Sequence, residues 1–160
     1  MTDKIISCGA IIIMGEKFLI GRPSWKNNVW NIPKGTMNPN ESEYDTAVRE
    51  IKEECNIDIQ NLKTVCIGKL KYLKNKDLVL YAVYLNDEEY TVQCNSTWSD
   101  VKGNLYPEMV DFKWIGIDEY DKYLNLGLKM LFESNYDMLY KLIKGEKNQC
   151  QRNNVIHNVL

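Results

Sequence analysis

Short apolar runs rich in β-branched residues alternate with polar turn segments along most of the chain. Residues 5–14 (IISCGAIIIM) and 17–21 (KFLIG) flank the dipeptide GE, which predicts a β-hairpin. A second pair of strands is expected at 62–73 and 77–85, joined by the residues KNK. The other expected segments are a short strand around 30–32 within the loop 22–40, a strand at 88–94, a loop at 95–108 and a strand at 109–117.

Two segments have the spacing of apolar residues that is typical of a helix. Asn40, followed three residues later by Glu43, forms a capping-box pattern, so a helix is expected to begin there. Its apolar stripe consists of Tyr44, Ala47, Val48 and Ile51. The helix is expected to end at Asn56, because asparagine tolerates the left-handed conformation that ends many helices. A last helix is expected at 126–144. Asp118 is the expected N-cap at the start of the preceding segment DEYDKYL, residues 118–124.

The order of these segments predicts the fold class. Strands, a helix, more strands and a closing helix predict an α/β protein with a mixed β-sheet sandwiched between α-helices, an α/β/α architecture. The chain has 160 residues, enough for one domain with a single core. We expect that domain at 1–144 and a frayed, polar C-terminal tail at 145–160.

Charge and cysteine usage narrow the possible partners and location. The net charge is −2 at pH 7, which argues against a protein that holds nucleic acid by bulk electrostatics. The sequence has no apolar run of about eighteen residues, so we expect no membrane-spanning helix. The five cysteines are an odd number without a C-x-x-C motif, which indicates a reducing compartment, and we expect a cytoplasmic protein.

The single histidine limits the chemistry that the chain can perform. His157 lies three residues from the C-terminus, so neither a Ser-His-Asp or Cys-His mechanism nor a zinc site built from imidazoles is expected in the folded body. Carboxylates, Lys, Tyr or Cys must then do any acid–base work. Carboxylate oxygens favour hard cations such as Mg²⁺ or Mn²⁺.

Three glutamates gather on one side of the expected first helix. Glu50, Glu53 and Glu54 follow Arg49 in the stretch REIKEEC, and like charges at such spacing repel one another. A solvated helix face is the ordinary explanation of adjacent glutamates. A cation bound between three carboxylates would offset their repulsion, so the cluster is also a candidate metal site.

The glutamates belong to a longer pattern that resembles the signature of the Nudix hydrolase family, G-x5-E-x7-R-E-U-x-E-E-x-G-U, where U is a bulky aliphatic residue. Eight of its nine defined positions match over 23 residues. The matching residues are Gly35, Glu41, Arg49, Glu50, Ile51, Glu53, Glu54 and Ile57. The chain departs from the pattern at Asn56, where the family has glycine. Because asparagine also tolerates the left-handed conformation, we expect an intact site.

The resemblance implies a metal-dependent hydrolase of pyrophosphate bonds that uses Mg²⁺ or Mn²⁺. The residues implied as ligands of the ion are Glu50, Glu53 and Glu54. Arg49 would hold the helix to the preceding loop through a charge-assisted bond to Glu41, the alternative being an exposed partner of Glu53. Gly35 would allow a tight backbone where the loop approaches phosphate.

Two flanking segments bear on the substrate. WNIPKG, at 30–35, resembles the loop of Nudix enzymes that act on dinucleoside polyphosphates, diphosphoinositol phosphates or RNA 5′ ends. This resemblance implies that Lys34 points at a substrate phosphate, an ordinary surface lysine being the alternative. Arg22, near the entrance of the loop, is a further candidate phosphate contact.

PEMVDFKW, at 107–114, resembles a segment of RNA pyrophosphohydrolases and their dinucleoside-tetraphosphate relatives in which a glutamate lies six residues before a tryptophan. The resemblance implies that Glu108 is a further metal ligand or the general base. An exposed loop glutamate is the alternative, and the base would then come from Glu53 or Glu54.

Three functions stay open at this point. The first is hydrolysis of a nucleoside polyphosphate, with dinucleoside polyphosphates or RNA 5′ ends preferred. The second is the same chemistry on nucleotide sugars or dinucleotides such as ADP-ribose or NADH. The third is a non-catalytic Nudix domain that senses a nucleotide, although such domains usually lose motif glutamates that this chain keeps. Aromatic residues that could stack on a base are Trp25, Trp98, Tyr72 and Tyr81, although those on strands are more often part of the core.

Overall fold

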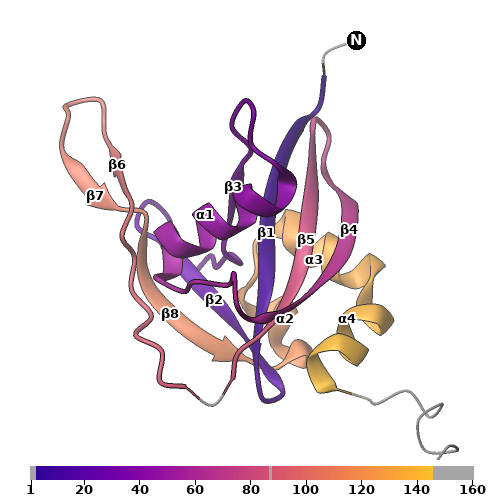
Figure 1. Ribbon diagram of the computed structural model, residues 1–160. Helices are drawn as coiled ribbons and strands as arrows, with labels where there is room; N and C mark the ends of the chain where they lie inside the picture. The colour runs from indigo at the N-terminus through magenta and orange to yellow at the C-terminus, as the bar shows by residue number, and fades with distance from the viewer. Residues whose placement is uncertain (1–2, 87, 146–160) are drawn as a thin grey trace, which may run out of the picture.

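The computed structural model describes residues 3–86 and 88–145 (Figure 1). The strands of the main sheet are β1 (Ile5–Met14), β2 (Lys17–Pro23), β3 (Lys34–Thr36), β4 (Lys63–Leu73), β5 (Lys76–Tyr84) and β8 (Met109–Ile115). A separate hairpin consists of β6 (Thr97–Ser99) and β7 (Leu105–Pro107). The helices are α1 (Glu43–Cys55), α2 (Tyr120–Tyr123), α3 (Leu126–Ser134) and α4 (Tyr136–Lys144), with a 3₁₀ helix at Ile117–Glu119.

The main sheet is mixed, as the sequence predicts. Its strands lie in the order β4-β5-β1-β2-β8, and β3 pairs with β1 outside this path. The pairing of β1 with β5 is parallel and the other pairings are antiparallel. One edge of β1 is shared: β3 pairs with residues 7–9 and β2 pairs with residues 13–14. The segment 34–36, which precedes α1, is thereby fixed beside the start of β1.

Helices cover both faces of the sheet, and Figure 1 shows α1 on one side with α3 and α4 on the other. Side chains of β1 alternate between the two layers, as expected for a strand buried on both faces: Ala10 and Ile12 pack with α1, and Ile11 and Ile13 pack with α3 and α4. The two hydrophobic cores confirm the predicted α/β/α class. The hairpin formed by the GE turn and the β4–β5 pair are confirmed as well.

The start of α1 differs from the prediction. Ser42, not Asn40, is the N-cap, and its hydroxyl accepts a hydrogen bond from the backbone N–H of Asp45 at 3.0 Å. Asn40 lies in a tight turn with φ 65°, a left-handed conformation that asparagine tolerates, and Glu41 N–H donates to the Asn38 carbonyl across that turn. Asn40 therefore shapes the turn before the helix, and Ser42 caps the helix.

The C-terminal helical region is divided where the sequence predicts one continuous helix at 126–144. Asn135 ends α3, since its side-chain amide donates to the Leu131 carbonyl at 2.8 Å and competes with the regular helix bonds. The expected N-cap at Asp118 is also wrong. Asp118 lies inside the 3₁₀ helix, whose preceding residue Gly116 donates its N–H to the Glu119 carboxylate.

Three further local predictions are wrong. Residues 88–94 form no strand, and 30–32 contribute only the isolated bridges Gly21↔Asn31 and Trp30↔Leu124. The expected loop 95–108 contains the β6–β7 hairpin, because Asp100 organises a turn there: its carboxylate accepts the N–H of Asn104 at 2.9 Å. Strands of three residues are too short to leave a clear alternating pattern.

The expected tail 145–160 and His157 lie almost entirely outside the described residues, which end at 145. Over residues 3–86 and 88–145, no helix is long and apolar enough to cross a membrane.

Candidate active site

Helix α1 presents the acidic residues and ends as predicted. Asn56 follows its last turn at φ 60° and ψ 24°, a left-handed conformation, and its N–H donates to the Lys52 carbonyl. The Asn56 side chain has a second role that glycine could not have. Its amide donates to the Thr91 carbonyl at 3.3 Å, and its oxygen accepts from the Asn95 side chain at 3.0 Å. The substitution at the motif's glycine position thus ties the helix end to the segment 91–95.

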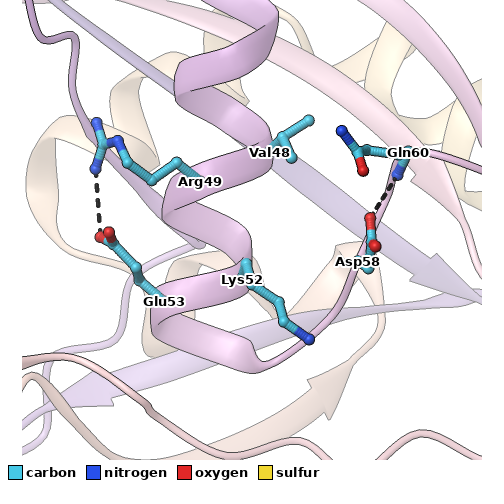
Figure 2. Close-up of a pocket in the computed structure, with 6 residues that line it drawn as sticks. All are labelled: Val48, Arg49, Lys52, Glu53, Asp58 and Gln60. Atoms are coloured by element: carbon cyan, nitrogen blue, oxygen red, sulfur yellow. Dashed lines mark hydrogen bonds and ion pairs between the residues drawn. The ribbon is translucent and has the colours of Figure 1, made fainter.

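Arg49 contacts three of the glutamates at this site. It binds Glu41 through two parallel hydrogen bonds of 2.8 and 3.0 Å, which confirms the expected link to the preceding loop. A third nitrogen contacts Glu50 at 2.7 Å and Glu53 at 3.3 Å, and a further bond reaches the Thr36 carbonyl at 3.1 Å. Figure 2 shows the Arg49–Glu53 contact on the outer face of α1. One guanidinium therefore holds three carboxylates and the strand β3 together.

The two-bond contact has an electrostatic consequence. The hydrogen bonds from Arg49 lower the pKa of Glu41 to about 2. The same contact raises the pKa of the Arg49 guanidinium above its ordinary value. Both groups are therefore ionised at neutral pH.

The three motif glutamates differ in burial. Glu50 and Glu54 are buried, at 8% and 6% exposure, while the Glu53 side chain is 44% exposed. Burial raises the pKa of Glu50, and Arg49 opposes that shift. Burial also raises the pKa of Glu54, and Lys34 opposes it. The negative charge of Glu108 contributes to both upward shifts, so Glu108 lies close enough to act on both groups.

Glu108 occupies the bend between β7 and β8 and is half-buried. Its N–H donates to the Ser96 carbonyl at 3.0 Å, and its carbonyl accepts the N–H of Ser24 at 3.1 Å. Its carboxylate accepts the Ser96 hydroxyl at 3.1 Å. The hairpin and the loop after β2 thus fix Glu108 on the wall of the site that faces α1.

Lys34 is the first residue of β3 and lies beside the acidic helix. Its backbone N–H donates to the Glu54 carboxylate at 3.0 Å, and its ammonium lies 5.6 Å from the centre of the Tyr72 ring. Burial lowers its pKa. Lys76 lies nearby, since its pKa is lowered by burial and by the charge of Lys34. Sequence reasoning missed Lys76, because only the parallel β1–β5 pairing brings the start of β5 to this place.

Gly35 contacts the acidic helix directly. A Cβ atom on Gly35 would lie 2.0 Å from the carboxyl carbon of Glu50, so any other residue would displace that carboxylate. Arg22 has a different environment: its ion-pair partner is Asp111, at 3.8 Å across the β2–β8 pairing. The structure therefore joins Gly35, but not Arg22, to the carboxylates of α1.

The carboxylates suit a hard cation, although their present rotamers do not surround one. Among residues 3–86 and 88–145, no three acidic, cysteine or histidine side chains are arranged to hold an ion. Glu50 turns to Arg49, and Glu54 turns to the Lys34 N–H. The buried carboxylates lie beside Gly35, which has no Cβ atom to crowd them. If these side chains rotate toward one another, their oxygens fit Mg²⁺ or Mn²⁺.

The fold and site define an α/β/α domain with an acidic helix braced by one arginine. A family model for the NUDIX domain matches residues 4–135, and the chain belongs to the Nudix family. It is similar to the asymmetrical bis(5′-nucleosyl)-tetraphosphatase of Sus scrofa, at 31% identity over 109 residues, 64% of this chain and 66% of that protein. The chain thus spans slightly less than two thirds of that relative.

Solved structures show the same fold. An Ap4A hydrolase of C. elegans, in a binary complex, superimposes with a TM-score of 0.61 at 23% identity, over 83% of this chain and 97% of that one. The ORF135 protein of E. coli gives a TM-score of 0.61 at 22% identity, over 86% and 92%. At these identities the likeness concerns the fold.

Proposed function

We propose that this chain is a pyrophosphohydrolase that cleaves a phosphoric anhydride bond of a nucleoside polyphosphate, with a dinucleoside polyphosphate or an RNA 5′ end preferred. One observation carries the proposal: α1 presents Glu50, Glu53 and Glu54, and Glu108 adds its charge from the opposite wall. So many carboxylates in one place favour a bound cation, and a cation is what polyphosphate hydrolysis requires.

The proposed cofactor is Mg²⁺ or Mn²⁺, held by Glu50, Glu53 and Glu54, with Glu108 on the opposite wall as either a further ligand or the general base. When bound, such an ion neutralises phosphate charge and lowers the pKa of water. Arg49 keeps Glu50 and Glu53 near each other in spite of their repulsion, and Glu41 fixes Arg49 in turn. Arg49 thus acts on the reaction through the carboxylates that it positions.

Glu108 is the proposed proton acceptor for the attacking water. It faces the acidic helix from the hairpin side, and Ser96 orients its carboxylate by a hydrogen bond. If Glu108 instead serves only as a metal ligand, Glu53 or Glu54 takes the proton. Either arrangement performs the hydrolysis without histidine.

Four groups are proposed to bind the substrate's phosphates. Lys34 supplies a cation beside Glu54, and Gly35 allows the backbone to approach closely. Arg22 would have to exchange its weak contact with Asp111 for a phosphate. Lys76 adds a second cation beside Lys34. The name of the pig relative, a bis(5′-nucleosyl)-tetraphosphatase, supports a substrate with several linked phosphates.

We also propose that the protein acts in the cytoplasm. The cysteines of the described part, Cys8, Cys55, Cys66 and Cys94, are all free thiols. Free thiols in this number suit a reducing compartment.

A substrate panel tests the proposal. Diadenosine tetraphosphate, a 5′-triphosphorylated RNA, ADP-ribose and NADH are each incubated with the protein and Mg²⁺ or Mn²⁺, with and without chelator. We expect metal-dependent cleavage of one of the first two. Preference for ADP-ribose or NADH would move the chain to the nucleotide-sugar and dinucleotide class. Binding without any cleavage would make it a nucleotide-sensing domain.

Two variants compare, in this assay, a glutamate that the motif defines with a glutamate of the same helix at a position that the motif leaves open. Glu53→Gln removes one ligand charge with little change of shape. Glu43→Gln, at the start of the same helix, removes a carboxylate whose ion pair is a 3.4 Å contact with Lys69. Cleavage should be lost in the first variant and kept in the second.

A further inference from the structure

The β6–β7 hairpin carries Glu108 and an aromatic pair on one face. Trp98 and Tyr106 are opposite each other in the pairing, and the Glu108 N–H bond to the Ser96 carbonyl extends the ladder by one residue on each strand, beyond the Thr97–Pro107 pair. Alternate residues of a strand point to the same side, so Tyr106 shares a face with Glu108, and Trp98 shares it with Ser96. The aromatic pair therefore lies about 6.6 Å further out along the hairpin than Glu108.

A third ring joins this pair from a different part of the chain. Trp98 and Tyr106 are stacked, with ring centres 5.2 Å apart and planes at 28°. Trp25, in the loop after β2, meets Trp98 edge-on at 5.6 Å. The Trp98 indole N–H donates to the Ser24 hydroxyl at 2.6 Å, and Ser24 also donates its N–H to the Glu108 carbonyl. The rings are thus fixed relative to Glu108.

Exposure separates these rings from ordinary core packing. Trp25 is 51% exposed and Tyr106 is 40% exposed, whereas large aromatic side chains are usually buried. A hairpin with three-residue strands needs a cross-strand pair for stability, and Trp98 with Tyr106 supplies it. That need does not explain Trp25, which comes from another loop and leaves half of its surface open.

We propose that Trp25, Trp98 and Tyr106 form a stacking platform for a nucleobase of the substrate. The inference rests on the proposed function, which puts a substrate phosphate beside Glu108. A group linked to that phosphate and extending outward along the hairpin reaches the three rings. Flat aromatic rings stack on the face of any base, so this aromatic platform selects a nucleoside rather than one particular base.

The platform would also favour substrates with a nucleoside at each end of the phosphate chain. Lys34 and Tyr72 lie on the sheet side of the acidic helix, and the platform lies beyond Glu108 on the opposite wall. A phosphate chain that runs between the walls has one end near each of them. A base at the hairpin end would stack on the platform.

Binding measurements test this without catalysis. The affinity of a methylene-bridged adenosine triphosphate analogue and of inorganic tripolyphosphate, each with Mg²⁺, is measured by calorimetry and by tryptophan fluorescence. Trp25→Ala should weaken binding of the nucleotide about tenfold and leave that of tripolyphosphate unchanged. Trp25→Phe, which keeps a ring, should bind nearly as well as the wild type. Val101→Ala, a fully exposed position at the hairpin tip, is the matched control.

Kinetics add an independent readout. With diadenosine tetraphosphate, Trp25→Ala should raise KM about tenfold and change kcat little, because the hydrogen bonds that hold Glu108 come from Ser24 and Ser96 and not from the Trp25 side chain. If the wild type cleaves nothing but binds the analogue through its rings, the proposed function fails and the platform stands.

Three results would overturn the platform. Unchanged nucleotide affinity in both Trp25→Ala and Trp98→Ala would mean that the rings do not touch the base. If Trp25→Ala weakened the binding of tripolyphosphate as much as that of the nucleotide, the substitution would be acting on the phosphate site and not on a base. A dimer in light scattering that Trp25→Ala dissociates, with no effect on nucleotide affinity, would make the rings a contact between copies of the chain.

Discussion

The wall formed by α1 and the wall formed by the β6–β7 hairpin hold their carboxylates by different means. On α1, one guanidinium binds Glu41, Glu50 and Glu53, and two of the three motif glutamates are buried. On the hairpin, Glu108 is half-buried and held by the neutral groups of Ser24 and Ser96. These hydrogen bonds to uncharged groups fix the position of Glu108 but do not neutralise the negative charge of its carboxylate.

The difference suggests a division of roles. Carboxylates crowded on a helix repel one another, and Arg49 offsets part of that repulsion. A carboxylate that no cation neutralises keeps its ability to accept a proton. The helix wall therefore suits metal binding, and the hairpin wall suits the base. Substitutions on the two walls should have different effects.

The largest expected effect is on the hairpin wall. Glu108→Gln removes the proposed proton acceptor and keeps the shape, so kcat should fall about a hundredfold or more while KM and the Tm stay nearly unchanged. Steady-state kinetics across metal concentrations measure this. Partial rescue by added metal would make Glu108 a ligand instead of the base. Wild-type behaviour at every metal level and pH would remove Glu108 from the site.

On the helix wall, loss of Arg49 should damage stability as well as rate. Arg49→Ala leaves three carboxylates without their common partner and should lower the Tm by roughly 5 °C or more, together with activity. Arg49→Lys should recover only part of this, because an ammonium cannot make the two parallel bonds to Glu41. Thermal unfolding measures the effect. An Arg49→Ala protein with an unchanged Tm would contradict the role of Arg49 as a brace.

The end of α1 should respond more weakly and in a graded way. Asn56→Val places a β-branched residue at φ 60° and should cost about 1–2 kcal/mol of unfolding free energy. Asn56→Gly relieves the backbone but loses the bonds to Thr91 and Asn95, so its stability should stay within about 1 kcal/mol of the wild type. Urea unfolding distinguishes them. Equal stability of the two variants would mean that the helix does not end in this conformation.

The smallest expected effect is a pH dependence that comes from Glu41. Its folded pKa of about 2 lies below the ordinary glutamate value of about 4.3. The native protein therefore binds this proton less readily than the unfolded chain, so the stabilisation is complete above about pH 5 and is lost as the pH falls toward 2. Glu41→Gln should lower the urea midpoint at pH 7 and match the wild type near pH 2. A constant difference between the two proteins at all pH values would be incompatible with this linkage.

The helix wall could be predicted from the sequence because its interactions are local. The capping region, the apolar stripe, the left-handed end at Asn56 and the Arg49–Glu41 contact all fall within residues 40–56, inside the 23 residues of the motif. Even here the sequence pattern favours Asn40 as the cap, whereas the structure has Ser42. The stretch NPNES offers several capping side chains, and only the turn geometry decides among them.

The hairpin wall could be predicted only in part. The family resemblance identifies Glu108 as a candidate, but strands of three residues leave no periodic signal, so the sequence predicts a loop where the structure has the hairpin. The contacts that position Glu108 join Ser24, Ser96 and Glu108, which lie far apart in the sequence. The proximity of Lys76 to Lys34 could not be predicted for the same reason. It depends on the parallel pairing of β1 with β5, two strands that lie far apart in the sequence.

The central claim is that the acidic face of α1 holds a divalent cation that hydrolysis requires. Hydrolysis of diadenosine tetraphosphate by the wild type and by Glu53→Gln, with calorimetric titration of Mn²⁺ into each protein, tests it most directly. We expect chelation to abolish the wild-type activity, and Mg²⁺ or Mn²⁺ to restore it. Glu53→Gln should bind Mn²⁺ more weakly and lose about a hundredfold or more in rate with little change in Tm. Hydrolysis by Glu53→Gln at the wild-type rate, or wild-type activity that survives chelation, would contradict the claim.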